Sequence, residues 1–381
     1  MESLLAAHRS VTVTGALPAA AFPSPSTALH AVAGRSTAAR AVRCAASSKN
    51  SVFYELENDE MFNSLEVIQW ESGKSMNSIA AAQGIRIRRR CQPRYPSEGT
   101  GADRVIPRNI LEQIIWDKEV DVSQKKAKKP LHKVKDSAQH APPPRDFIGA
   151  LAAARLRNAA PALIAEVKKA SPSRGLLRDH FNPVEIANAY EMNGAACLSI
   201  LTDEKHFQGS FENLETVRNS GVKCPILCKE FVIDSWQIYY ARSKGADAIL
   251  LIAAVLPDID IKYMLGVCKN LGMTALLEVH DERELDRVLK IDGVQLIGIN
   301  NRSLETFHVD TANTKMLLEK RGDIIRKKGI LVVSESGLFT PDDVAYVQNA
   351  GVSAVLVGES LLTQENPGEA IVGLFGKELL Q

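Results

Sequence analysis

The sequence predicts an α/β protein, a (β/α)8 TIM barrel with extra N-terminal helices before its first strand. From Pro161 onward, apolar runs of four to six residues alternate with amphipathic helical stretches, and eight such units fit into roughly 220 residues. The runs are almost continuously apolar, which is typical of parallel strands that are buried on both faces. An open, doubly wound sheet is the alternative, but no G-x-G-x-x-G motif follows the first strand.

The elements follow in regular order along the chain. The expected strands cover residues 162–166, 197–201, 225–229, 248–252, 274–278, 296–300, 330–334 and 354–357. The expected helices that follow them cover residues 183–193, 211–220, 235–243, 259–271, 282–290, 311–320, 341–349 and 368–378. Two more helices precede the first strand: one is capped by Asn109 and carries an apolar stripe, and the other covers 146–155. Because they lie outside the strand–helix repeat, we expect them to cover an end of the barrel.

The first 48 residues have the composition of an organelle transit peptide. Between Ser3 and Tyr54 there is no acidic residue, and Ser, Thr, Ala and Arg dominate. The Ser-rich, Pro-containing character favours a plastid, so we expect the chain in the chloroplast stroma. Residues 49–108 mix Ser, Gly and charges, and the basic run at 86–90 lacks the interleaved aromatic residues of a nucleic-acid patch. We expect a poorly ordered arm there, followed by the barrel with its helical extension over 109–381.

The composition argues against several classes of protein. The chain has 46 Lys and Arg against 45 Asp and Glu, so no net charge attracts it to nucleic acid or to a membrane surface. No apolar run reaches the length of about 18 residues that a membrane-spanning helix needs. The six cysteines are scattered without metal-ligand spacing, which argues against a zinc site and for a reducing compartment.

Charged and polar residues gather where the predicted strands end. Glu166 and Lys168 stand two residues apart at the end of the first strand, so their side chains share one face. One such pair alone would fit a surface ion pair equally well. Active sites of (β/α)8 barrels lie at the carboxyl ends of the strands. The same rim also receives polar residues from the third, fifth, sixth and seventh strands: Lys229, Glu278, Asn300, Arg302 and Glu335. This convergence favours an active site.

Small residues follow the last two strands. Ser336 and Gly337 come after the seventh strand, and Gly358, Glu359 and Ser360 come after the eighth. Small residues let backbone amides approach an anion, and barrels often bind phosphate with these two loops. We therefore expect a small, phosphorylated substrate, although turn glycines would give the same pattern.

Six motifs, in order and at appropriate spacing, resemble the indole-3-glycerol-phosphate synthase family, in its plant plastid form. They are Ile164-Ala-Glu-Val-Lys-Lys-Ala-Ser-Pro-Ser173, Leu227-Cys-Lys-Glu-Phe231, Leu276-Leu-Glu-Val-His280, Ile297-Gly-Ile-Asn-Asn-Arg302, Ser334-Glu-Ser-Gly337 and Val357-Gly-Glu-Ser360. The resemblance runs from about Asn109 to the carboxyl end. It implies a carboxy-lyase of tryptophan biosynthesis that converts 1-(2-carboxyphenylamino)-1-deoxyribulose 5-phosphate to indole-3-glycerol phosphate, with loss of carbon dioxide and water. It implies no metal and no organic cofactor.

The resemblance also implies roles for individual residues. Lys229 matches the acid that protonates the ketone oxygen, and Glu278 and Glu166 match groups that shuttle a proton during dehydration. Lys168 either binds the phosphate or assists proton transfer, and Asn300 completes the catalytic set. The implied substrate-binding residues are Arg302, Ser173, Phe231, Leu251 and Glu335, and the implied phosphate-binding residues are Ser336, Gly337, Gly358, Glu359 and Ser360. Some family members have serine at the position of Glu359, whose carboxylate would repel phosphate if it turned toward it.

Other barrels of the same pathway fit less well. Phosphoribosylanthranilate isomerase would need a cysteine where this chain has Glu166 and an aspartate where it has Asn300. The tryptophan synthase α chain has no counterpart to the pair Lys168 and Lys229. A different class of function is a catalytically silent homologue that docks onto a pathway enzyme. As partners we expect a contact with tryptophan synthase, and either a monomer or a homodimer.

Overall fold

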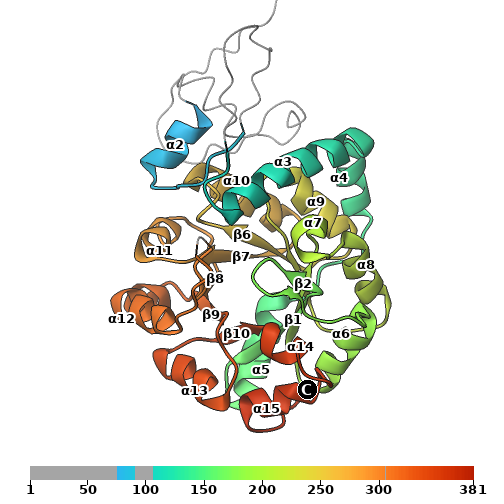
Figure 1. The fold of residues 1–381 in the computed structure, drawn as a ribbon, viewed down its shortest axis with the longest axis vertical. Helices are drawn as coiled ribbons and strands as arrows, with labels where there is room; N and C mark the ends of the chain where they lie inside the picture. Colours follow the sequence, from blue (N-terminus) through green and yellow to red (C-terminus); the bar gives the residue numbers. More distant parts are fainter. Residues whose placement is uncertain (1–74, 91–105, 305) are drawn as a thin grey trace, which may run out of the picture. The chain divides into compact units, whose positions relative to one another are not determined.

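The computed structural model describes residues 75–90, 106–304 and 306–381. In these residues, parallel strands close into a barrel in the order β1-β10-β9-β8-β7-β6-β5-β4, and helices surround it (Figure 1). The predicted (β/α)8 fold is confirmed, and every strand lies within one residue of its predicted bounds. The barrel strands are β1 (Ala162–Val167), β4 (Cys197–Leu201), β5 (Ile226–Lys229), β6 (Ala248–Ile252), β7 (Thr274–Val279), β8 (Leu296–Asn300), β9 (Leu331–Glu335) and β10 (Ala354–Val357).

The outer helices fall where the sequence predicts them, with two differences in length. They are α6 (Pro183–Met192), α8 (Phe211–Asn219), α9 (Ser235–Ser243), α10 (Asp258–Asn270), α11 (Glu282–Val288), α12 (Ala312–Lys327), α13 (Pro341–Ala350) and α15 (Ala370–Phe375). Helix α12 is longer than predicted because its buried face continues to Ile325. Helix α15 is shorter because Gly376 has a φ of +65°, a left-handed conformation that ends a helix. Two short helices, α7 (Glu204–Phe207) and α14 (Glu359–Leu362), follow β4 and β10.

A small hairpin follows β1, where the sequence predicted only a surface loop. Strands β2 (Ala170–Ser171) and β3 (Gly175–Leu176) pair antiparallel. Gly175 takes a φ of +68°, a conformation that glycine adopts without steric cost. The hairpin places the residues between β2 and β3 at the carboxyl end of the barrel.

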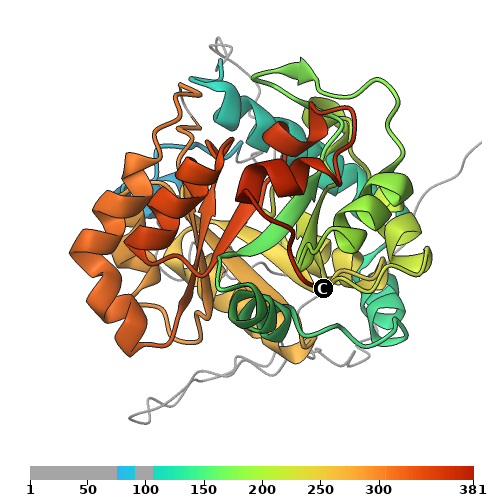
Figure 2. The same cartoon turned by 90° about the horizontal axis from the view of Figure 1, so that it is seen from below.

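Three helices within residues 106–161 lead directly into the first barrel strand. They are α3 (Ile110–Lys128), α4 (Leu131–Gln139) and α5 (Phe147–Asn158). The Asn109 side chain caps α3 as predicted, since its oxygen accepts a hydrogen bond from the amide of Glu112. Figure 2 shows α3 and α5 at opposite ends of the barrel. The extension therefore covers both ends, whereas the sequence predicted only one.

The segment 75–90 lies within the arm that the sequence predicts over 49–108. It contains α2 (Met76–Ala82) and an extended stretch in which Ile85 and Ile87 are buried. Arg88 Nη2 lies 2.6 Å from Glu112 Oε2 on α3, and Trp116 Nε1 donates to the carbonyl of Arg88 at 2.7 Å. The basic run is thus partly paired with carboxylates of α3. The predicted transit peptide (1–48) and the rest of the arm lie outside the described residues.

Candidate active site

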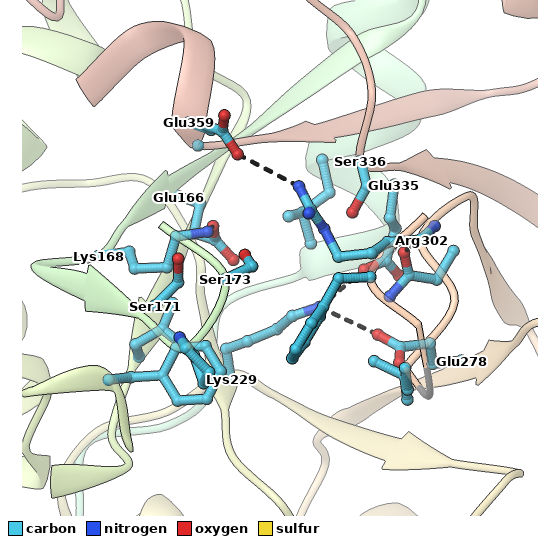
Figure 3. A pocket seen from close by; sticks show the side chains of 18 of the residues that line it. Glu166, Lys168, Ser171, Ser173, Lys229, Glu278, Arg302, Glu335, Ser336 and Glu359 are labelled. Carbon is cyan, nitrogen blue, oxygen red and sulfur yellow. Dashed lines mark hydrogen bonds and ion pairs between the residues drawn. The ribbon is translucent and has the colours of Figure 1, made fainter. Parts of the chain in front are cut away.

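A pocket opens at the carboxyl ends of the barrel strands, between the hairpin, α3 and the loops after β8, β9 and β10 (Figure 3). Every predicted site residue except Leu251 lines it. The lining residues from this set are Glu166, Lys168, Ser173, Lys229, Phe231, Glu278, Asn300, Arg302, Glu335, Ser336, Gly337, Gly358, Glu359 and Ser360. Residues far apart in the sequence therefore meet at one rim, as the strand order of the barrel requires.

The placement of Leu251 in the pocket was wrong. Leu250 and Ile252 line the pocket, whereas Leu251 is buried without lining it. Successive residues of a strand point to opposite faces, so the neighbours of an inward-facing residue must point outward. The positions of β6 that face the pocket are therefore Leu250 and Ile252.

Lys229 lies at the centre of the charged half of the pocket. Its Nζ is 2.7 Å from Glu335 Oε2 and 3.1 Å from Glu278 Oε2. Burial alone would lower the pKa of Lys229, but these carboxylates outweigh it and raise the pKa above its usual range. Burial, together with the neighbouring Glu278, raises the pKa of Glu335 to about 7, although Lys229 opposes the shift. The site thus holds a permanently charged ammonium between two unlike carboxyl groups.

Two glycines make room for the buried carboxylates. A Cβ atom at Gly298 would lie 2.0 Å from Glu335 Oε1, and one at Gly358 would lie 2.3 Å from Glu166 Oε2. Real Cβ atoms do not approach other atoms so closely, so any larger residue would displace these carboxylates. Glu166 in turn forms an ion pair with Lys168, and the two side chains lie together as their two-residue spacing predicts. The absence of a side chain at Gly298 and Gly358 therefore leaves room for the carboxylates of Glu335 and Glu166.

The opposite half of the pocket is apolar. Helix α3 contributes Ile110, Leu111 and Ile114, and the rings of Phe207 and Phe231 lie 5.8 Å apart at a tilt of 40°. The loops after β8 and β9 add Leu304, Phe307, Leu338 and Phe339. A wall of this kind suits a flat aromatic ring. The sequence did not predict that α3 would supply part of it.

The loops after β9 and β10 bring the small residues predicted to bind phosphate to one pocket. Ser336 and Gly337 have φ angles of +68° and +82°, and a Cβ at Gly337 would lie 2.6 Å from Cγ1 of Val309. Asn301 fixes this turn, because its Nδ2 donates to the carbonyl of Ser336 at 3.1 Å. Gly358 begins α14, where the first backbone N–H groups have no partner within the helix. Both turns face the same pocket.

Glu359 lies between two arginines. Its Oε2 is 3.2 Å from Arg302 Nη2, and its Oε1 is 2.8 Å from Arg174 Nε on the hairpin. Figure 3 shows the contact with Arg302. The Glu359 carboxylate therefore forms ion pairs with two guanidinium groups. Arg174 had no predicted role, and its position in the hairpin gave no signal for this contact.

A second cluster of buried charges adjoins the pocket, and the sequence did not predict it. Lys118 of α3 lies 2.7 Å from Asp203 Oδ2 and 2.9 Å from Glu230 Oε1. Glu230 lines the pocket between Lys229 and Phe231. The position of Glu230 next to Lys229 was the only local signal, because its partners come from distant parts of the chain.

Among the described residues, no helix is long and apolar enough to cross a membrane, and no three side chains of His, Cys, Asp or Glu are grouped to hold a metal ion. A barrel with a charged pocket at the carboxyl ends of its strands is typical of (β/α)8 barrel enzymes that act on small substrates. Comparison with protein families matches residues 111–374 to the family described as Indole-3-glycerol phosphate synthase.

Curated relatives agree with this match. The chain is 58% identical over 326 residues to the chloroplastic indole-3-glycerol phosphate synthase of Arabidopsis thaliana, covering 83% of this chain and 81% of that protein. It is 57% identical to the synthase of Rippkaea orientalis, covering 71% of this chain and 91% of that protein. It is 56% identical to the synthase of Microcystis aeruginosa, covering 71% of this chain and 90% of that protein. The chain belongs to the indole-3-glycerol phosphate synthase family, as the resemblance predicted.

Proposed function

We propose that this pocket binds 1-(2-carboxyphenylamino)-1-deoxyribulose 5-phosphate and converts it to indole-3-glycerol phosphate, with release of carbon dioxide and water. The observation that carries the proposal is the position of Lys229. Its ammonium group lies between Glu278 and Glu335, with two anion-binding turns on one side and an apolar wall on the other. This arrangement suits a substrate with a phosphate at one end and a benzene ring at the other.

The substrate lies across the pocket in one orientation. Its phosphate binds the backbone amides of the turns at Ser336–Gly337 and Gly358–Ser360. Its benzene ring packs against Ile110, Leu111 and Phe231. The ring carboxylate binds Arg302, whose guanidinium group has five donors and can hold this carboxylate while it contacts Glu359. The ketone then lies between the two ends, within reach of Lys229.

Lys229 assists ring closure. The ring carbon that bears the carboxylate attacks the ketone carbon, and negative charge develops on the ketone oxygen. A fixed ammonium group stabilises that charge, and it can donate a proton because an alkoxide is a stronger base than an amine. The new bond leaves the attacked ring without aromaticity, and loss of carbon dioxide restores it.

Dehydration completes the indole ring. The hydroxyl group formed from the ketone leaves as water, and a proton is lost from the adjacent carbon. Lys229 and His280 hold the pKa of Glu278 well below its usual range, although burial alone would raise it, so Glu278 is ionised and can accept that proton. The ion pair of Glu166 and Lys168 lies on the opposite side of the pocket. It supplies the proton for the leaving hydroxyl, or Lys168 binds the phosphate instead.

The proposal extends to the setting of the enzyme. Its reaction is that of a carboxy-lyase, and acid–base groups of the chain account for every step without a metal or organic cofactor. The composition of residues 1–48 supports a location in the chloroplast stroma. The enzyme is a monomer or a homodimer and contacts tryptophan synthase.

The test follows indole fluorescence after the substrate is added to the full-length chain. We expect saturable product formation, reduced by about 100-fold to 10,000-fold in Lys229→Ala. Lys244→Ala is the matched control, because Lys244 pairs with Glu215 on the outer helices and does not line the pocket. A folded wild-type chain that binds phosphate but forms no product would reject the proposal. It would favour the silent docking subunit.

A further inference from the structure

His280 stands directly behind a residue of the proposed catalytic set without lining the pocket. It follows β7, and its side chain is 13% exposed. Its Nε2 lies 3.3 Å from Glu278 Oε1, on the side of that carboxylate opposite to Lys229, which contacts Oε2 at 3.1 Å. Each oxygen of Glu278 therefore faces its own basic group.

The imidazole ring of His280 is fixed from behind. Its Nδ1 lies 3.1 Å from Glu284 Oε2, and the same oxygen accepts the backbone amide of His280 at 2.8 Å. Glu284 is held at the start of α11, because its amide donates to the capping residue Asp281 at 2.8 Å. Asn313 of α12 donates to the His280 carbonyl at 3.0 Å. The loop after β7 thus has the contacts needed to orient one ring.

Positive and negative groups alternate along a row that begins behind the pocket and ends in it. The order is Glu284, His280, Glu278, Lys229 and Glu335, with successive contacts of 3.1, 3.3, 3.1 and 2.7 Å. Burial alone would lower the pKa of His280, but the close approach of the two flanking glutamates raises it to about 10. The ring is therefore an imidazolium at neutral pH.

We propose that His280 is a positioning residue that keeps the Glu278 carboxylate ionised and correctly oriented for proton transfer. This inference rests on the proposed function, in which Glu278 is the base of the dehydration step. The other charged groups that face the pair are Lys229 from β5, Glu335 from β9 and Glu284 from α11. Only Lys229 adds a second positive charge, so loss of His280 leaves Glu278 with one cation instead of two.

The consequence for pH dependence has a definite sign. A carboxylate that loses a nearby positive charge takes up a proton at higher pH. In His280→Asn, Glu278 therefore becomes protonated at a higher pH than in the wild type. The acid limb of the kcat profile lies below the usual pKa of a glutamate in the wild type and moves upward toward that value in the variant. Activity is lost first at low pH, and KM changes little because His280 does not touch the substrate.

The experiment compares kcat and KM from about pH 3.5 to pH 9 for the wild type, His280→Asn and His206→Asn, so that the range includes the usual pKa of a glutamate. His206 is the matched control: its side chain is also 13% exposed, and it also contacts a carboxylate, Asp117 at 2.9 Å. We expect the acid limb to move only in His280→Asn. An unmoved limb in an active His280→Asn variant would overturn the inference.

A second measurement does not depend on turnover or on the folding of the variant. Nitrogen NMR of the wild type with labelled histidine reports whether each ring is neutral or charged. We expect His280 to remain an imidazolium at about pH 8, where an ordinary histidine is neutral. A neutral ring at that pH would overturn the inference. Absence of product at every pH with a charged His280 would instead reject the proposed function.

Discussion

Replacing Lys118 by methionine removes the cation of the buried cluster beside the pocket. Lys118, Asp203 and Glu230 have side chains that are no more than 3% exposed, with contacts of 2.7 and 2.9 Å. Methionine is flexible and of similar length, so the change removes the charge with little loss of packing. The two carboxylates are then left in the interior without their buried cation.

The size of the effect follows from these contacts. Removing one partner of a buried ion pair costs about 3–5 kcal/mol. Asp203 still accepts the amide of His206 at 2.7 Å, and Glu230 still accepts the hydroxyl of Thr202 at 2.9 Å, so we expect the lower end. A loss of about 3 kcal/mol lowers Tm by roughly 6–12 °C in a domain of this size.

The effect should also depend on pH. A buried carboxylate without a cation has a higher pKa in the folded chain than in the unfolded chain. The protonated carboxyl group is tolerated in the interior, whereas the ionised form is not. The free energy of unfolding therefore falls as pH rises through the folded pKa. We therefore expect Lys118→Met to lose more stability at about pH 8 than at about pH 5.5.

Thermal unfolding followed by circular dichroism measures both effects. Lys125→Met is the control, because Lys125 lies on the same helix and contacts Asp121 and Glu204, whose side chains are 36% and 59% exposed. Exposed pairs contribute at most about 1 kcal/mol. Equal changes in Tm for the two variants would refute the reasoning from burial.

Three further predictions concern the pocket. The pKa of Glu335 is raised to about 7, so its contribution to the free energy of unfolding is present below the unfolded pKa and is lost as pH rises toward 7. In urea unfolding, Glu335→Gln should therefore lack this decrease of the free energy with pH. An unchanged decrease would exclude Glu335 as its source. Gly337→Ala forces a strained φ and a contact with Val309, so the Ki of inorganic phosphate should rise about tenfold; an unchanged Ki would argue against a phosphate site there. Glu359→Ser removes a negative charge from the phosphate turn, so KM should fall; a rise would show instead that Glu359 positions Arg302.

The barrel could be predicted because its signals are local. Each strand is an apolar run that ends at polar residues, so its bounds are visible in the sequence. Helix α4 could not be found in this way, because only Val134 and Ala138 are buried in it. The order of residues 75–90 depends on contacts such as Arg88 with Glu112, which are 24 positions apart. No local pattern indicates such a pair.

The site was predictable where a residue directly follows a strand, and less so elsewhere. Leu251 shows the limit within a strand, because β6 is apolar at every position and gives no alternation to distinguish its inner and outer faces. His280 shows the limit outside it. The residue belongs to a motif that pointed to the family, yet its contact with Glu278 depends on how the loop after β7 folds back onto Glu284.

The helix α3 belongs to the catalytic pocket, although it precedes the barrel in the sequence. Its first turns supply apolar residues to the pocket wall, and Lys118 joins the same helix to Glu230, the neighbour of Lys229. On its other side, Glu112 accepts hydrogen bonds from Arg88 and from the amide of Arg108. These bonds lower the pKa of Glu112 to about 2, although burial alone would raise it. The segment 75–90 is therefore one contact away from a wall of the site, and a change there can alter substrate binding without touching the substrate.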